Sequence, residues 1–141
     1  PDLLIAEGRF GVALGEDTVI AQQKFEECIA QACSRDPWLA QHPVEVQWWG
    51  GQFASGQTEP DSRIIKDLAF AHAQITETPL EEYGAPYGSD LRLLTGLAGI
   101  PTVQYGPGDA GVAHAPNEYV QIAELVTTAR VVAELIQISI G

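Results

Sequence analysis

In the first third of the chain, the spacing of apolar residues changes from alternation to the spacing of a helix and then back to alternation. From Leu3 to Leu14 the later apolar side chains alternate with small or polar ones, which predicts a strand with one apolar face. A stripe with spacings of three and four follows, and it predicts a helix that Asp17 or Thr18 caps and that Pro37 ends. The stripe consists of Ala21, Phe25, Cys28, Ile29 and Ala32. Alternation returns over Val44–Trp48 and predicts a second strand that Gly50 and Gly51 interrupt.

The rest of the chain is predicted to contain a linker, three helices and one strand. Residues 54–62 are small and polar and read as a linker. Helices are predicted over Ser62–Glu77, over 91–98 and from about Glu118 to Ile138, with Asn117 as the cap of the last one. The stripe of that last helix consists of Ile122, Val126, Ala129, Ala133 and Ile136. The short apolar run 100–105 is typical of a buried parallel strand.

These elements indicate two α/β units, residues 1–56 and residues 57–141. Each unit has fewer strands than a sheet usually needs. The pattern therefore predicts that both units are incomplete and that strands are missing from the sequence. The chain also begins with Pro1 and contains no Met, which suggests a processed, cropped or partial chain.

Charge and composition narrow the class of partner. The 141 residues carry a net charge of −12, and both predicted units are acidic. Nucleic acids and anionic membrane surfaces are recognised by clustered Lys and Arg, so neither is an expected partner. No apolar run is long enough to span a bilayer, and no signal peptide is visible. We expect a cytoplasmic protein in which Cys28 and Cys33, five residues apart on one helix, stay reduced.

His114 is the main candidate for chemistry. It follows a predicted strand and a Gly-Pro-Gly turn, where open α/β sheets place ligands, and the glycines leave backbone N–H groups open. Neutral imidazole is a common metal ligand, although a lone loop histidine is more often a surface residue. A zinc site needs three or four ligands, and no HExxH or CxxC motif is present. His42 and His72 read as surface residues.

The segment GSDLR, residues 88–92, supports two interpretations. Ser89 or Asp90 can cap the short helix while Arg92 stays on the surface. Alternatively, Asp90 supports a nearby site and Arg92 binds an anion. The carboxylate of Glu118 suits the start of a helix, and a role near a metal site is the alternative.

The blocks GSDLR, GIPTVQYGPG and AHAPNEYV together resemble the last part of the acetylornithine deacetylase / succinyl-diaminopimelate desuccinylase family. The segments IAEGRFGVALGED and DPWLAQHPVEVQWWGGQF are similar to the later part of that family's lid domain. The resemblance covers the whole chain but only about the last third of a family member. It implies the second half of a ferredoxin-like, dimerising lid at residues 1–56 and the C-terminal part of a zinc-peptidase-like α/β catalytic domain at residues 57–141.

The resemblance also assigns roles. It makes His114 a metal ligand, and it places Gly106 and Gly108 at the substrate pocket, where Arg92 is the candidate anion-binding side chain. Asp90, Asn117 and Glu118 are supporting residues that do not bind metal. The general base and the other ligands have no counterpart in this sequence.

The implied activity is hydrolysis of the amide bond of N-acyl amino acids or related compounds, by a homodimer with two Zn²⁺ ions, or Co²⁺, in each site. The 141-residue chain alone is expected to be inactive. The alternative is a non-catalytic dimerisation module that has lost the metal site. A third interpretation, a nucleotide-binding domain that uses GPGDAG, lacks the full glycine fingerprint and the P-loop lysine.

Overall fold

The computed structural model describes residues 3–140, so Pro1, on which the expectation about the start of the chain rests, lies outside the described residues. Two compact units are present. The first comprises the residues up to Gln57 together with Pro86–Arg92, and the second comprises Thr58–Ala85 and the residues from Leu93 onward.

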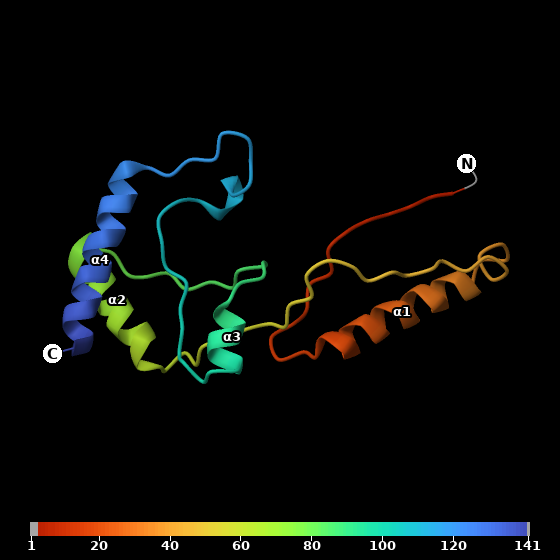
Figure 1. Cartoon of the computed structure of the whole chain (residues 1–141), viewed down its shortest axis with the longest axis horizontal. Helices are drawn as coiled ribbons and strands as arrows, with labels where there is room; N and C mark the ends of the chain where they lie inside the picture. Colours follow the sequence, from red (N-terminus) through yellow and green to blue (C-terminus); the bar gives the residue numbers. More distant parts are fainter. Residues whose placement is uncertain (1–2, 141) are drawn as a thin grey trace. The chain divides into compact units, whose positions relative to one another are not determined.

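The first unit is organised around helix α1, Thr18–Ser34, which is drawn in orange in Figure 1. Its start is fixed locally, because Asp17 Oδ1 accepts hydrogen bonds from the N–H groups of Val19 and Ile20 at 2.8 and 3.1 Å. After the helix, Asp36 Oδ1 accepts from the N–H groups of Trp38 and Leu39, both at 2.9 Å. The predicted helix and its Asp17 cap are confirmed.

Three aromatic rings join the segments of this unit. The ring centroid of Phe25 on α1 lies 5.0 Å from that of Phe10 and 5.5 Å from that of Trp48. The indole Nε1–H of Trp48 also donates to Glu26 Oε1 at 2.6 Å. The faces that the sequence pattern assigned to Phe10, Phe25 and Trp48 therefore do meet.

The predicted strands are absent: no part of residues 3–140 forms a β-strand. Segments 3–14 and 43–53 run as extended chain in Figure 1. They meet α1 through side chains, as in the hydrogen bond from Gln22 Nε2 to Gln52 Oε1 at 2.9 Å. A strand exists only where a neighbour completes its backbone ladder, and within the described residues neither segment has one. The prediction of an α/β sheet in this chain is corrected accordingly.

The second unit is built on helices α2, Arg63–Thr76, and α4, Ile122–Ile140, which pack together (Figure 1). Their shared core consists of Leu68 and Ala71 on α2 and Val131 on α4. Val103 and Tyr105, from the run predicted as a strand, pack against this core. Thr58 fixes that run through its hydroxyl, which donates to the carbonyl of Thr102 and accepts from its N–H.

Two predictions about the last helix are wrong. It begins at Ile122, not at Glu118, because Asn117 has a left-handed backbone with φ 61° in place of the extended conformation of a helix cap. The predicted stripe also lies on the exposed face, since Ile122 is 80% and Ile136 53% exposed whereas Val131 is buried. This helix is apolar on more than one face, so its periodicity does not identify the packed side.

The short elements complete the chain. Helix α3, Leu91–Gly96, lies within the range predicted for it, and the 3₁₀ turn η1 comprises Ala110–Val112. Among the helices of the described residues, none combines the length and the hydropathy that crossing a membrane requires. Cys28 and Cys33 are both free thiols.

Candidate functional site

The candidate site lies in the second unit, on the loop between residues 105 and 122. Gly106, Pro107 and Gly108 open the loop, and Gly108 has φ 96°, a backbone conformation that favours glycine. Asp109 then caps η1 through Oδ1, which accepts from the N–H of Gly111 at 2.7 Å. The glycine turn predicted from the sequence is therefore followed by a locally capped 3₁₀ turn.

His114 stands on a strained part of this loop. Its φ of 62° is left-handed, which is uncommon for a residue other than glycine. Its N–H donates to Glu118 Oε2 at 3.0 Å, and Asn117, also left-handed, lies between them in sequence. The carboxylate of Glu118 thus holds the backbone of His114, while the imidazole is exposed. All three residues belong to the motif AHAPNEYV, and the structure places them on consecutive turns of one loop.

The Gly-Pro-Gly turn is held by a residue that the sequence analysis did not single out. The N–H of Gly108 donates to Glu124 Oε2 on the first turn of α4 at 2.9 Å. That N–H is consequently engaged within the chain, whereas the sequence predicted open backbone donors at this turn. No local signal in the sequence marked Glu124, because the helix was predicted to begin at about Glu118, which would place Glu124 beyond the first turn.

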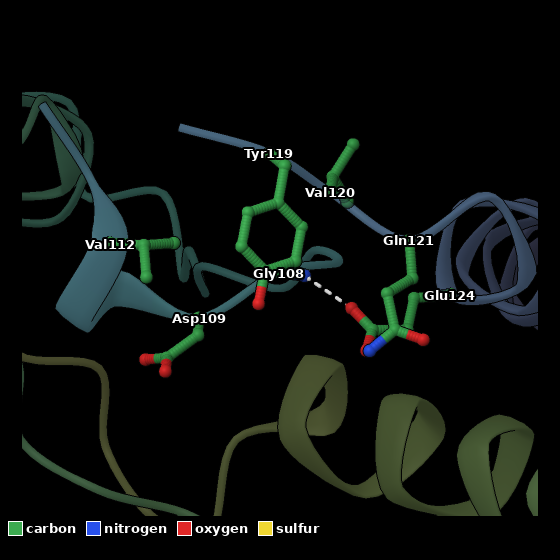
Figure 2. Close-up of a pocket in the computed structure, with 7 residues that line it drawn as sticks. All are labelled: Gly108, Asp109, Val112, Tyr119, Val120, Gln121 and Glu124. Atoms are coloured by element: carbon green, nitrogen blue, oxygen red, sulfur yellow. Dashed lines mark hydrogen bonds between the residues drawn. The ribbon is translucent and has the colours of Figure 1, made fainter. Parts of the chain in front are cut away.

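Two hollows adjoin this turn. In Figure 2 the ring of Tyr119 stands over one hollow, with Asp109 to one side and Glu124 to the other; Gly108, Val112, Val120 and Gln121 also line it. Gly106, Pro107, Gly108 and Tyr105 face Ala123, Glu124, Thr127 and Thr128 of α4 across the second hollow. Gly106 and Gly108 thus both line a pocket, and His114 is not among the lining residues of these two.

Asp90 and Arg92 belong to the first unit. The hydroxyl of Ser89 accepts from the N–H of Leu91, the first residue of α3, at 3.3 Å, and Asp90 is exposed. The guanidinium of Arg92 lies over the ring of Phe53, with Cζ 4.8 Å from the ring centroid. Its Nε is buried with no hydrogen-bond partner. Arg92 is therefore partly packed and not a free surface residue.

His72 is not the surface residue that the sequence suggested. Its Nδ1 is joined to the hydroxyl of Tyr105 by a hydrogen bond of 2.9 Å, and the two rings meet edge to face. Burial raises the pKa of the Tyr105 phenol above its usual range. The two residues are 33 positions apart, and nothing in the local pattern marks them as partners.

The described residues do not complete a metal centre. Across residues 3–140, no three His, Cys, Asp or Glu side chains come together in a way that could hold an ion. A zinc site needs at least three protein ligands. The imidazole of His114 is exposed and belongs to no such group among these residues.

Comparison with known proteins gives the family. The sequence model of peptidase family M20/M25/M40 matches residues 4–138. No solved structure gives a significant match.

The curated relatives are longer proteins. An N-formyl-4-amino-5-aminomethyl-2-methylpyrimidine deformylase of Halalkalibacterium halodurans is 30% identical over 112 residues, 74% of this chain and 26% of the relative. The deformylase of the same name in Bacillus subtilis is 27% identical over 129 residues, 85% of this chain and 29% of the relative. An acetylornithine deacetylase of Myxococcus xanthus is 33% identical over 79 residues, 56% of this chain and 19% of the relative.

This chain therefore spans less than a third of the length of the curated relatives it matches. The family match covers nearly all of the chain. The resemblance drawn from the blocks around GSDLR and Gly-Pro-Gly is confirmed at the level of the family. The chain belongs to peptidase family M20/M25/M40.

Proposed function

We propose that this chain is the C-terminal portion of a metal-dependent amidohydrolase that cleaves the amide bond of N-acyl amino acids or related compounds. The family match over residues 4–138 supports a hydrolase. The relatives are named as a deformylase of an N-formyl compound and as a deacetylase of acetylornithine, which supports removal of an acyl group from nitrogen.

The observation that carries the proposal is the turn around His114. An exposed imidazole stands on a turn whose backbone is held by the carboxylate of Glu118. His114 would occupy one ligand position of a zinc site, or of a cobalt site, and the remaining ligands and the general base would come from sequence outside this chain. Metal ions held there would supply Lewis-acid chemistry for amide hydrolysis.

The pocket residues fit a supporting role. We propose that Gly106 and Gly108 line the substrate pocket, that Arg92 binds a substrate anion, and that Asp90, Asn117 and Glu118 support the site. The position of Gly106 and Gly108 at the hollow beside α4 agrees with this role. The guanidinium of Arg92 has the charge and geometry to pair with an anion, and its contact with the ring of Phe53 holds the side chain in place.

The exposure of large apolar side chains supports a larger α/β fold. We propose that residues 1–56 are the second half of a ferredoxin-like lid that dimerises, and that residues 57–141 belong to the catalytic domain. Leu4 is 87% and Ile140 81% exposed, an unusual state for large apolar side chains on a complete domain. The extended segments 3–14, 43–53 and 100–105 would become strands when pairing partners are present. The parent protein would be a cytoplasmic homodimer.

The test is hydrolysis of N-acetyl and N-formyl substrates by two samples with added zinc: the 141-residue chain, and the polypeptide that carries this sequence in its source. We expect no hydrolysis by the former and hydrolysis by the latter. In the latter, His114→Ala should lower kcat/KM by more than about 100-fold, because a site with a missing ligand loses several kcal/mol of transition-state stabilisation. The matched control His42→Ala changes an exposed histidine of the first unit and should leave activity unchanged.

Either of two results would contradict the proposal. Zinc-dependent hydrolysis by the 141-residue chain alone would mean that the site is complete within it. A source polypeptide that dimerises but neither binds zinc nor hydrolyses any of these amides would favour the non-catalytic dimerisation module instead.

A further inference from the structure

The segment that leads into the Gly-Pro-Gly turn is anchored at Tyr105. This side chain is half-buried and packs against the core of Leu68, Ala71 and Val131. Two of the next three residues, Gly106 and Gly108, are glycines with no side chain to pack, and the third is Pro107. The position of Tyr105 therefore sets where the turn begins.

The polar end of Tyr105 is held by His72 on α2. The hydrogen bond between His72 Nδ1 and the Tyr105 hydroxyl measures 2.9 Å. The two ring centroids lie 5.8 Å apart at an interplanar angle of 84°. A half-buried hydroxyl without a partner would be costly, so this hydrogen bond selects one position of the Tyr105 ring.

The far end of the turn is held by the other helix. Glu124 on α4 accepts the N–H of Gly108 at 2.9 Å. Gly106 and Pro107 therefore lie between two residues that the helices hold. Tyr105 is hydrogen-bonded to α2, and Gly108 is hydrogen-bonded to α4. If either hydrogen bond is removed, the turn is free to leave the wall of the hollow that it lines.

We propose that His72 is a positioning residue that sets the place of the Gly106–Gly108 turn through Tyr105. Its importance for substrate rests on the proposed function, in which this turn lines the substrate pocket. The effect of His72 on the position of the turn involves only described residues of the second unit, and it requires neither metal nor substrate.

The experiment measures amide hydrogen exchange by NMR on the 141-residue chain. Gly108 reports on the turn, and Val131 in α4 reports on the integrity of the unit. His72→Phe keeps a ring of similar size but removes Nδ1, so we expect Gly108 exchange to rise by about 2- to 10-fold with Val131 unchanged. His72→Asn places a polar atom near the position of Nδ1 and should restore most of the protection. The matched control His42→Phe makes the same chemical change in the first unit and should leave Gly108 unchanged.

Tyr105→Phe removes the other partner and retains the ring packing. We expect it to accelerate Gly108 exchange as His72→Phe does, and the double variant to add nothing further, because both remove one interaction. If His72→Phe also accelerates exchange at Val131, this variant has loosened the whole unit. The exchange of Gly108 in Tyr105→Phe then tests the proposal. Unchanged Gly108 exchange in Tyr105→Phe, failure of His72→Asn to restore protection, or full additivity of the two changes would overturn the proposal. Absence of hydrolysis or metal binding would leave it standing, so the two proposals fail separately.

Discussion

At the scale of single residues, the candidate site depends on two backbone N–H groups that carboxylates hold, one nearby in the sequence and one on α4. Glu118 binds the N–H of His114, and Glu124 binds the N–H of Gly108. The sequence motif placed His114, Asn117 and Glu118 close together, because they lie within five residues. It could not show Glu124 or the pair of His72 and Tyr105, because these contacts join positions 16 and 33 residues apart.

The phenol of Tyr105 gives a prediction about pH. Its pKa is raised by burial, so the folded chain keeps this proton at a pH where the unfolded chain, with an ordinary pKa of about 10, loses it. The folded state then binds more protons, so stability falls as pH rises above about 10 and until the folded pKa is passed. In an alkaline titration of ultraviolet absorbance, one of the four tyrosines should ionise last, and Tyr105→Phe should remove that step. Loss of an earlier step in that variant would contradict the assignment.

At the scale of elements, the helices were predictable because their signals are local. Asp17 caps α1 through a hydrogen bond to the next turn, and the spacing of Leu68 and Ala71 marks the packed face of α2. The start and the packed face of α4 were missed, since the left-handed Asn117 and a second apolar face are not visible in periodicity. Strands were predicted from the alternation of apolar and polar residues within a single segment. A strand also needs a second segment that pairs with its backbone, and alternation does not show whether one is present.

The packing of α2 on α4 gives a prediction about stability. Leu68 is 3% exposed in the shared core, so Leu68→Ala should lower the free energy of unfolding of the second unit by about 2–5 kcal/mol. Leu97 of the same unit is 83% exposed, and Leu97→Ala should change it by less than about 0.5 kcal/mol. Urea unfolding of the full chain, followed by circular dichroism, measures both. Equal losses in the two variants would mean that the α2–α4 core does not stabilise the unit.

At the scale of the whole molecule, three observations agree. The chain belongs to a family whose curated relatives are more than three times as long as the part that matches. The described residues leave large apolar side chains exposed on α4 and on the segment that begins at Leu3. Within residues 3–140, no three His, Cys, Asp or Glu side chains gather into a group that could hold a metal ion. The larger metal-dependent hydrolase that we propose would account for all three.

Native mass spectrometry of the polypeptide that carries this sequence in its source tests the central claim most directly, because it reports intact mass and bound metal together. We predict a mass well above the 15.1 kDa of this chain, two zinc or cobalt ions in each polypeptide, and loss of metal in His114→Ala but not in His42→Ala. A polypeptide of 15.1 kDa that carries no metal would contradict the account.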